Sequence, residues 1–372
     1  MAKKVVVAMS GGVDSSVAAY RLAEAGFEVI GVFMRTGIFA RDKETGVKRC
    51  CSANDARDAR SVAEALKIRF FVQNFERDFD TLIDYFCREY SSGRTPNPCI
   101  ICNQRLKFGR LLHFARSLKA EYVATGHYAR VEKNNGRFLL KRGSDPDKDQ
   151  AYVLFSLSQE QLSRAIFPVG QMRKSEVRQI AQKLGLKTKD KPESQEICFV
   201  PEDDYRTLLK ERRGSRIRPG KIVDLSGRIL GEHPGIEFFT TGQRHGLGIA
   251  EGQPLYVVAI DKEKDLVIVG GESDLYQTTC SVSDVNWVAF SEPPARFEAQ
   301  VKIRYAHKAA PAVVTPLAGQ AETGGAARVE FARPQRAITP GQAAVFYSGE
   351  VVLGGGWIEK VFDNKGDSSG KH

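Results

Sequence analysis

The first 26 residues hold the feature that most limits how this chain can fold. An uninterrupted apolar run at residues 5–9 is followed by the string Ser-Gly-Gly-Val-Asp-Ser at residues 10–15, and apolar residues then recur at helical spacing up to Gly26. A continuous apolar run is typical of a strand buried on both faces, as in a parallel sheet, and a glycine ends many helices. The sequence therefore predicts a strand, a glycine-containing loop and a helix at the start of a parallel α/β domain.

The same alternation continues to about residue 130. We expect strands at residues 27–33, 69–72 and 122–125, with helices at about 52–66, 79–86 and 103–118. Repeated β-α units of this length form a parallel sheet with helices on both faces. An Asn-Asn-Gly string at residues 134–136, between two apolar runs, predicts a β-hairpin.

The character of the chain changes near residue 205. Helical periodicity fades, and short apolar runs such as residues 238–240 alternate with Gly and Pro. Many short strands at this spacing are typical of small antiparallel barrels. We therefore expect an α/β protein: an N-terminal parallel-sheet domain at 1–205, a small β-rich central domain at 206–272, a C-terminal antiparallel β-barrel at 273–364, and a flexible tail at 365–372.

Composition narrows the class of protein. Lys and Arg number 55 against 45 Asp and Glu, a net charge of +10, with seven basic residues between 203 and 221 and six between 301 and 336. This balance favours a polyanionic partner, although a solvated charged face would give the same pattern. No stretch approaches the roughly 18 apolar residues of a membrane span, and no signal peptide is recognisable. We expect a cytoplasmic protein, in which seven cysteines indicate thiol chemistry or metal binding.

The glycine-containing loop has the chemistry of a phosphate site. Two glycines let the backbone approach a bound group, the helix N-terminus offers N–H groups and a positive dipole end, and three serine hydroxyls are close by. Asp14 could help to hold Mg²⁺ on the phosphates. The string matches neither a Walker A loop nor a Gly-x-Gly-x-x-Gly fingerprint. A glycine-rich turn capped by Ser and Asp is the alternative.

Three cysteines stand out in the sequence. Cys99 and Cys102 precede the helix expected at 103–118, and Cys198 follows 96 positions later. A thiol at a helix N-terminus has a lowered pKa, which favours a nucleophile or metal ligand. A zinc hook or simple burial is the alternative for this pair, although no second Cys-x-x-Cys completes four ligands. Cys87 falls on an apolar helix face, Cys280 gives no signal, and Cys50 and Cys51 are interpreted as bystanders, with a further metal or redox site as the alternative.

Strings along almost the whole chain carry a family resemblance. The Ser-Gly-Gly-x-Asp-Ser loop resembles the PP-loop of ATP pyrophosphatases, which cleave ATP between the α and β phosphates. The further strings resemble one family of that group, the tRNA-specific 2-thiouridylases. They are Thr95-Pro-Asn-Pro-Cys99, Cys102-Asn103, Lys107-Phe108, Thr125-Gly-His-Tyr-Ala-Arg130, Lys148-Asp149-Gln150, Gln195–Phe199, Gly242-Gln-Arg244, Arg304-Tyr305, Thr339-Pro-Gly-Gln342 and Gly354-Gly-Gly356.

The resemblance implies an activity and its partners. Such an enzyme uses ATP and Mg²⁺ to adenylate the C2 oxygen of the wobble uridine, position 34, in lysine, glutamate and glutamine tRNAs, and sulfur then replaces that oxygen. Cys198 carries the sulfur as a persulfide, Cys102 is the second catalytic thiol, and the two pair afterwards as a disulfide. A cysteine desulfurase or a sulfur-relay protein supplies the sulfur, and a monomer is expected. A low-pKa sulfur suits the displacement of AMP.

The resemblance also assigns binding residues. The expected ATP-binding residues are Ala8, Met9, Ser10, Gly11, Gly12, Val13, Asp14, Ser15, Met34 and Gly126. The expected tRNA-binding residues are Asn97, Pro98, Cys99, His127, Lys148, Asp149, Gln150, Arg304, Tyr305 and Gln342.

One residue departs from the family pattern and leaves a second mechanism of sulfur transfer open. Some members of the family have Asp where this chain has Cys99, so Cys99, Cys102 and Cys198 could instead ligate a [4Fe–4S] cluster with one open iron. Two further alternatives are a PP-loop ligase or amidotransferase with a nitrogen nucleophile, and a non-catalytic, metal-hooked RNA-binding module.

Overall fold

The computed structural model describes residues 2–37, 53–189, 191, 197–200, 204–249, 251–317 and 325–362. The chain divides into two compact units. The first contains residues 1–83, 98–203 and 350–352, and the second contains residues 84–97, 204–349 and 353–372. Each unit is described by itself. The expected tail at 365–372 lies outside the described residues.

A five-stranded sheet forms the centre of the first unit. It consists of β1 (Lys4–Ala8), β2 (Glu28–Arg35), β3 (Arg69–Asn74), β4 (Tyr122–Ala124) and β7 (Ala165–Ile166), in the order β3-β2-β1-β4-β7. The neighbouring strands of this sheet pair in parallel, which confirms the expected fold class. The chain first adds β2 and β3 on one side of β1 and then returns to place β4 on the other. The gap between β1 and β4 is therefore the switch point of the sheet, where ligands bind at the carboxyl ends of strands.

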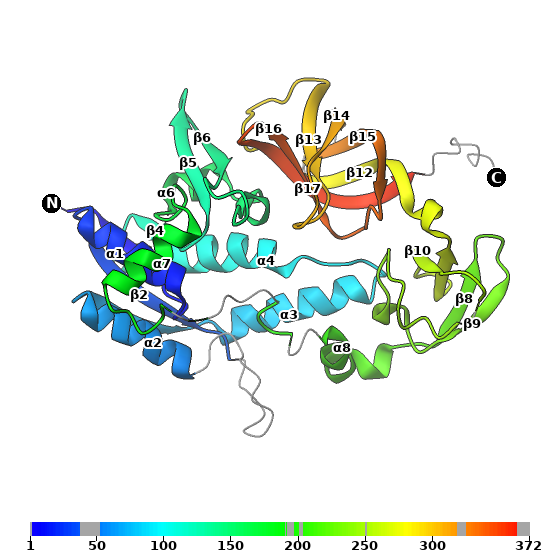
Figure 1. Ribbon diagram of the computed structural model, residues 1–372, viewed down its shortest axis with the longest axis horizontal. Coiled ribbons are helices and arrows are strands. Elements are labelled where there is room, and N and C mark those ends of the chain that lie inside the picture. Colours follow the sequence, from blue (N-terminus) through cyan, green and yellow to red (C-terminus); the bar gives the residue numbers. More distant parts are fainter. Residues whose placement is uncertain are drawn as a thin grey trace. The chain divides into compact units, whose positions relative to one another are not determined.

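Apolar residues of the sheet and of three helices, α1, α2 and α7, form one core cluster. Val5, Val6 and Val7 of β1 are fully buried, as expected for a strand covered on both faces. The helices are α1 (Val13–Glu24), α2 (Ala53–Ala65), α3 (Glu76–Tyr90), α6 (Gln159–Arg164) and α7 (Lys174–Lys183). Val17 of α1 and Val177 of α7 belong to the same core cluster, and Figure 1 shows α1 beside α7.

The helix that carries the first cysteine pair begins earlier than the sequence predicts. It runs without a break through α4 (Pro98–Ile101), the π-helix η1 (Cys102–Arg110) and α5 (Leu111–Ser117). Proline is favoured at a first helical position because its missing N–H would have no helical partner there. The expected start near residue 103 is therefore wrong by about one turn.

The predicted hairpin at residues 134–136 is confirmed. Strands β5 (Ala129–Asn134) and β6 (Arg137–Arg142) pair antiparallel around Asn135 and Gly136, whose φ angles are +47° and +80°. Two positive φ angles in succession are those of a type I′ turn. The chain then continues through the short helix η2 (Ala151–Leu154).

The second unit contains a four-stranded sheet in the order β10-β11-β8-β9. The strands are β8 (Gly220–Asp224), β9 (Ile229–His233), β10 (Tyr256–Asp261) and β11 (Leu266–Gly270), and α8 (Tyr205–Arg213) and η4 (Gly214–Arg216) precede them. Two expectations are wrong here. Helical structure does not end at 205, because α8 follows it. Residues 238–240 form no strand, because Phe238 ends the 3₁₀ turn η5 (Ile236–Phe238) and residues 239–240 have no regular structure.

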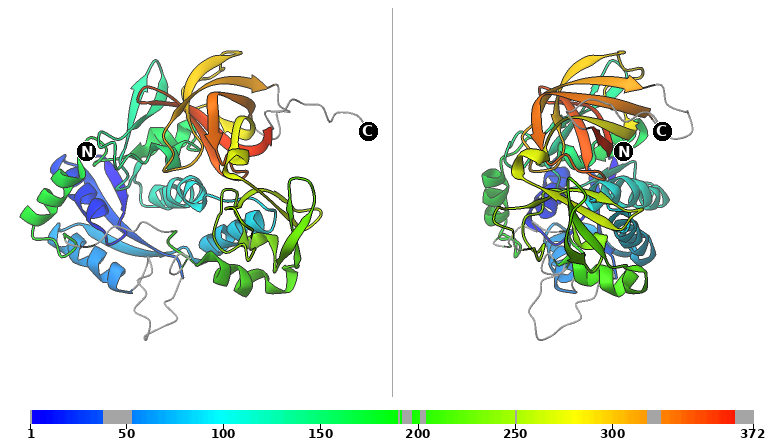
Figure 2. Two further views of the ribbon diagram at one scale, coloured as in Figure 1. Left: turned by 45° about the vertical axis from the view of Figure 1, so that its right-hand side comes forward. Right: turned by 90° about the vertical axis from the view of Figure 1, so that its right-hand side faces the viewer.

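The C-terminal part of the second unit is a closed antiparallel barrel, as predicted. After η6 (Glu272–Leu275), the strands are β12 (Tyr276–Asn286), β13 (Phe297–Lys302), β14 (Ala310–Leu317), β15 (Gly325–Arg336), β16 (Ala343–Ser348) and β17 (Val351–Phe362). They lie in the order β12-β15-β14-β13-β16-β17, and an additional β12–β17 pairing closes the ring, visible in Figure 2. Within the described part of the chain, no helix is long and apolar enough to cross a bilayer.

Candidate nucleotide and thiol site

The loop after β1 has a geometry that exposes backbone donors. Helix α1 begins at Val13 with Gly12 as its N-cap, and no side chain caps this end. Gly11 has a φ of +73°, and a Cβ there would lie 2.4 Å from the carbonyl oxygen of Asp55 in α2. Only glycine fits this combination of conformation and close approach. The open N-terminus of α1 is suited to an anion such as phosphate.

The three serines of the loop differ in their hydrogen bonds and in their exposure. The Ser15 hydroxyl accepts a hydrogen bond from the Ser10 N–H at 3.2 Å and donates to the Gly12 carbonyl at 3.1 Å. The Ser16 hydroxyl, which is fully buried, donates to the same carbonyl at 2.8 Å. Ser15 and Ser16 therefore fix the shape of the loop, whereas Ser10 is exposed. The Ser16 hydroxyl is therefore not available to a bound phosphate, although the sequence places it beside the loop.

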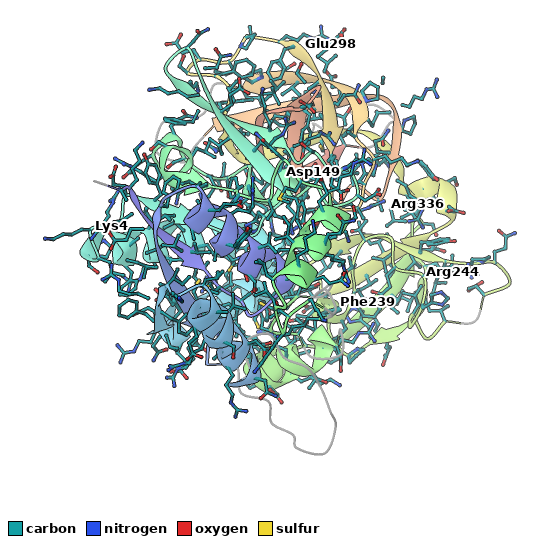
Figure 3. All side chains as sticks on the ribbon, turned by 60° about the vertical axis from the view of Figure 1, so that its left-hand side comes forward. Lys4, Asp149, Phe239, Arg244, Glu298 and Arg336 are labelled. Carbon is teal, nitrogen blue, oxygen red and sulfur yellow. The ribbon has the colours of Figure 1, made fainter. Side chains whose placement is uncertain are left out.

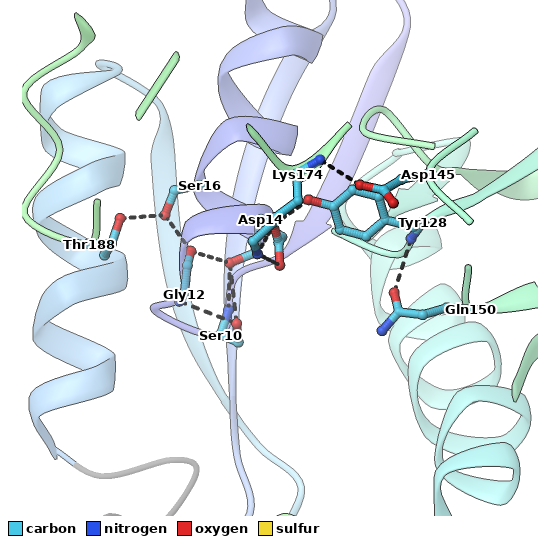
Figure 4. A network of polar contacts seen from close by, with 10 residues as sticks. Ser10, Gly12, Asp14, Ser16, Tyr128, Asp145, Gln150, Lys174 and Thr188 are labelled. Atoms are coloured by element: carbon cyan, nitrogen blue, oxygen red, sulfur yellow. Dashed lines mark hydrogen bonds and ion pairs between the residues drawn. The ribbon is translucent and has the colours of Figure 1, made fainter. Parts of the chain in front are cut away.

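Asp14 is held by two side chains from distant parts of the sequence. The Lys174 ammonium lies 2.7 and 2.8 Å from the two carboxylate oxygens, and the Tyr128 hydroxyl donates to one of them at 2.8 Å (Figure 4). Lys174 is buried at the start of α7, where its N–H donates to Asp145 at 2.9 Å. The sequence did not indicate Lys174, because nothing near it in the chain relates it to Asp14.

Asp14 suits a magnesium ion that is shared with a nucleotide. Mg²⁺ is commonly bound by one or two carboxylates together with substrate phosphates. The Asp14 side chain is 31% exposed, and its second oxygen accepts a hydrogen bond from Lys174 at 2.8 Å. The residues present therefore fit an ion held mainly by phosphate oxygens.

The other expected nucleotide contacts lie at neighbouring strand ends. Gly126 follows β4 and packs against the loop so closely that a Cβ would lie 2.7 Å from the backbone of Asp14 and Ser15. Met34 is partly buried near the end of β2. The structure thus brings Gly126 to the loop after β1, and it places Met34 on the adjacent strand.

The thiols differ in accessibility. Cys99 is exposed in the first turn of α4, and Cys102 opens the π-helix at partial burial. Burial raises the pKa of Cys102 above its usual value, and the Lys107 ammonium opposes part of this effect. The expected lowering of this pKa by a helix N-terminus is therefore wrong, because the helix begins a full turn earlier at Pro98. The next residue, Asn103, is buried and donates to the Val153 carbonyl at 2.9 Å, which fixes the turn.

The remaining cysteines separate into three groups. Cys198 is partly buried within a turn in which the Val200 N–H donates to the Ile197 carbonyl at 2.9 Å. Cys87 and Cys280 are fully buried, and burial raises the pKa of Cys87 to about 11, so both are packing residues. Cys50 and Cys51 lie outside the described residues.

The described side chains do not form a ligand set for a metal cluster. Across the residues that the structure describes, no three Cys, His, Asp or Glu side chains converge in a way that could hold a metal ion. Cys99, Cys102 and Cys198 therefore do not fit a [4Fe–4S] cluster in this arrangement, and the zinc hook on Cys99 and Cys102 is equally incomplete.

His127 is a neutral group beside the nucleotide loop. It is buried just after β4, where its Nδ1 lies 2.7 Å from the Thr125 hydroxyl. Burial, together with the nearby Lys107 ammonium, holds the pKa of His127 well below its usual value. Lys107 thus acts on both His127 and Cys102, a relation that the spacing of the sequence did not indicate.

Two of the residues at 148–150 accept hydrogen bonds from backbone N–H groups of the same unit. Asp149, labelled in Figure 3, is buried and accepts hydrogen bonds from the N–H groups of Gly143 and Ala151 at 3.1 and 3.0 Å. Gln150 accepts from the Tyr128 N–H at 3.0 Å. Lys148 is partly buried. Asp149 and Gln150 therefore order the segment that follows β6.

The second unit contains the other expected tRNA contacts. Tyr305 is 43% exposed beside Lys302, and Arg304 donates to the carbonyl of Arg336 at 3.3 Å. Gln342 donates to the carbonyls of Thr95 and Pro96 at 3.0 and 3.3 Å, directly before Asn97. A cavity of about 730 Å³ in the same unit is lined by three basic side chains, Arg304, Lys308 and Arg333, together with His307 and Gln335.

Comparison with known proteins identifies the family of each part. Residues 3–202 match the model described as tRNA methyl transferase HUP domain. Residues 206–271 match the tRNA methyl transferase PRC-barrel domain, and residues 277–358 match the aminomethyltransferase beta-barrel domain.

Several curated relatives are similar along nearly their whole length. The chain is 52% identical to the tRNA-specific 2-thiouridylase MnmA of Carboxydothermus hydrogenoformans, over 96% of this chain and 98% of that protein. It is 52% identical to the protein of the same name from Geobacter metallireducens, over 96% and 97%, and 50% identical to that of Moorella thermoacetica, over 96% and 99%. The chain belongs to the MnmA family of tRNA-specific 2-thiouridylases.

Proposed function

We propose that this chain replaces the C2 oxygen of the wobble uridine in lysine, glutamate and glutamine tRNAs by sulfur, at the expense of ATP. The observation that carries the proposal is that the nucleotide loop and the two thiols, Cys102 and Cys198, belong to one compact unit. Family membership gives the reaction class, and the net charge of +10 suits a polyanionic substrate.

The first step is adenylation. The C2 oxygen of the uridine attacks the α-phosphorus of ATP, and pyrophosphate leaves. The N–H groups at the start of α1 hold the phosphates, and Gly11 and Gly126 let the loop pack closely against the backbone of Asp55 and the end of β4. A Mg²⁺ ion on the phosphates, held also by Asp14, would neutralise their charge. Lys174 orients the Asp14 carboxylate from the opposite side.

The second step transfers sulfur. The terminal sulfur of a persulfide on Cys198 attacks C2, and AMP leaves with the former C2 oxygen. The Cys102 thiolate then attacks the Cys198 sulfur, so that the S–S bond of the persulfide breaks, 2-thiouridine is released and a Cys102–Cys198 disulfide forms. A thiol reductant must reduce this disulfide before the next cycle. Lys107 favours the Cys102 thiolate, against the effect of burial.

The remaining assignments belong to the same proposal. His127, Lys148 and Gln150 in the first unit, and Asn97, Arg304, Tyr305 and Gln342 in the second, contact the tRNA. Pro98 and Cys99 contact the target base. Asp149 belongs to the tRNA-binding segment with Lys148 and Gln150, and it orders that segment through the N–H groups of Gly143 and Ala151. We also propose domain limits at residues 205 and 272, which are supported by the start of α8 at Tyr205 and of β12 at Tyr276.

Cellular context completes the proposal. The enzyme works as a cytoplasmic monomer, and a cysteine desulfurase, directly or through a relay protein, loads Cys198. Purification without oxygen, with iron and acid-labile sulfide measured per chain, tests the competing chemistry. Iron well below one per chain agrees with the persulfide route. About four irons, lost together with activity in Cys99→Ala, would establish a cluster instead.

The thiolation assay tests the function itself. Unmodified lysine tRNA is incubated with the chain, ATP, Mg²⁺, a cysteine desulfurase and cysteine, and 2-thiouridine is measured. We expect product with the wild type, none with Cys102→Ser or Cys198→Ser, and near-normal product with the matched control Cys280→Ala, whose thiol is buried in the barrel. Normal ATP-dependent turnover in both serine variants would instead favour a nitrogen nucleophile.

A further inference from the structure

The helix that carries Cys102 changes its hydrogen-bond spacing at that residue. Cys102 opens the nine-residue π-helix η1, and at its end the Leu111 N–H donates to the Leu106 carbonyl, five positions back. A Cβ on Gly109 would lie 3.1 Å from the Gln104 carbonyl oxygen, which is also five positions back. Most π-helical segments are single turns inside an α-helix. A π-helix of this length therefore needs support from outside the helix.

A glutamine of α6 supplies such support. The Gln161 side-chain nitrogen donates to the Gln104 carbonyl at 2.8 Å and to the Phe108 carbonyl at 3.0 Å. In an α-helix, the Gln104 carbonyl would accept from the Phe108 N–H, four positions on. Helices depart from α-helical bonding where a side chain enters this ladder of hydrogen bonds. Gln161 therefore competes with the α-helical bond and favours the wider turn of η1.

The Gln161 amide is fixed at both of its ends. Its Oε1 accepts from the Ser158 N–H at 3.0 Å, and the Ser158 hydroxyl accepts from the Gln161 N–H at 3.2 Å, which forms a capping box at the start of α6. The amide oxygen thus meets a donor and the amide nitrogen meets acceptors, so one orientation satisfies both. The Gln104 side chain adds a further tie, because its nitrogen donates to the Ser156 carbonyl at 3.1 Å.

The π-helical spacing decides which side chain shares a face with Cys102. Five positions of an α-helix make about 1.4 turns, so Lys107 would point away from Cys102. In a π-helix, residues five positions apart are joined by a hydrogen bond and lie one above the other. The pKa values agree with this placement. Burial raises the pKa of Cys102 and the Lys107 ammonium opposes part of the rise, while burial and the same ammonium lower the pKa of His127.

The second half of the proposed reaction depends on the Cys102 thiolate. This thiolate attacks the Cys198 sulfur, the S–S bond to the sulfur on the uridine breaks, and its electron pair leaves with 2-thiouridine. The thiolate and not the thiol is the nucleophile. A cation at the position of Lys107 therefore raises the reactive fraction of Cys102, and the same cation turned away by an α-helical spacing would not.

We propose that Gln161 is a positioning residue for sulfur transfer, because it holds η1 in the π-helical form that places Lys107 beside Cys102. The step that it serves rests on the proposed function, whereas the placement of Lys107 is a property of the free enzyme. Gln161 acts through Lys107, so its removal should change the reactivity of Cys102 only while Lys107 is present.

The test follows alkylation of the Cys102 peptide by iodoacetamide between pH 7 and 9. We expect Gln161→Met to slow alkylation at pH 7 about fivefold, as Lys107→Met does, since one partly screened charge has an effect of this size. The double variant should be no slower than Lys107→Met alone. Gln159→Met is the matched control, because its amide joins the same helix to Phe138 through two hydrogen bonds of 2.9 Å. Its alkylation profile should equal that of the wild type.

Two results would overturn the proposal. One is an unchanged alkylation profile in Gln161→Met, and the other is a double variant in which the two effects add. If Gln161→Met does not fold, Gln161→Glu takes its place, because the carboxylate still accepts from Ser158 and has lost both donors. Its slower alkylation should also disappear when Lys107 is replaced by methionine. Slowing that persists there would come from the new negative charge, and it would refute the positioning role.

Thiolation kinetics separate this proposal from the proposed function. In a single turnover, Gln161→Met should release 2-thiouridine more slowly than the wild type, with an unchanged KM for ATP. A raised KM for ATP with a normal rate of release would contradict a role in sulfur transfer. A wild type that forms no 2-thiouridine would refute the proposed function, whereas alkylation would still decide whether Gln161 positions Lys107.

Discussion

Replacement of Gly126 by alanine tests how the nucleotide loop is built. The added Cβ would lie 2.7 Å from the backbone of Asp14 and Ser15, well inside the 3.4 Å at which ordinary contact begins. These neighbours are backbone atoms of the first turn of α1, so they cannot rotate away as a side chain can. The turn must shift by about 0.7 Å, and forced overpacking of this kind costs about 1–3 kcal/mol.

The displaced first turn of α1 is where the phosphates are expected to bind. The free energy of this displacement should therefore lower the efficiency with which the enzyme uses ATP. We expect kcat/KM for ATP to fall about 5- to 140-fold, which corresponds to that free energy. The assay is ATP-dependent thiolation at varied ATP, together with thermal unfolding. Gly214→Ala is the control, because no atom lies within 4 Å of its Cβ and its backbone is already helical. A Gly126→Ala enzyme with a kcat/KM within twofold of the wild type would refute the reasoning.

Three further predictions concern charged groups of the first unit. Lys174→Met should lower ATP-dependent turnover at least tenfold, and a double-mutant cycle with Asp14→Asn should show coupling of about 1–3 kcal/mol; additive effects would contradict the contact. Because burial raises the pKa of Cys102, its alkylation by iodoacetamide should accelerate as pH rises from 7 to 9. Lys107→Met should slow this alkylation at every pH in that range, because the Lys107 ammonium favours the thiolate. Equal alkylation rates in Lys107→Met and the wild type would argue against the role of Lys107. Because the pKa of His127 is held well below its usual value, its NMR titration should show no inflection between pH 6 and 8; an inflection near 6.5 would contradict its burial.

Local sequence patterns predicted those helices, strands and turns whose conformation depends on their own residues rather than on distant contacts. The Asn135-Gly136 turn is an example, because both residues tolerate the positive φ angles of a type I′ turn. The strand at residues 4–8 is another, because an unbroken apolar run has to be buried on both faces.

Helix α8 was missed because its burial depends on a neighbour. Leu209 is its one fully buried residue, and Tyr205 stacks on Tyr90 with a centroid distance of 4.6 Å. A helix with so narrow an apolar face has little periodic signal in the sequence. Tertiary contacts, which local patterns do not contain, decide its conformation.

In the nucleotide site, too, some features could be predicted from local sequence and others depend on tertiary contacts. The loop at residues 10–15 could be recognised from its glycines, serines and aspartate, which are adjacent in the sequence. The lysines that contact the loop could not be recognised from the sequence, because Lys174 and Lys191 lie about 160 and 180 positions away from it in the chain. The pKa of Cys102 was mispredicted for a similar reason: the sequence indicated a helix end there, but the helix begins at Pro98, and the burial of the partly exposed Cys102 raises the pKa of its thiol.

The central claim is that the sulfur of the product passes through Cys198. The most direct measurement loads the chain with ³⁵S from labelled cysteine and a desulfurase, removes the donor, confirms the label on the Cys198 peptide, and then adds unmodified tRNA and ATP in a single turnover. We predict that the label leaves Cys198 and appears in 2-thiouridine in equal amount, only when ATP is present, together with a Cys102–Cys198 disulfide. Label that remains on Cys198 while unlabelled 2-thiouridine forms from added sulfide would contradict the account.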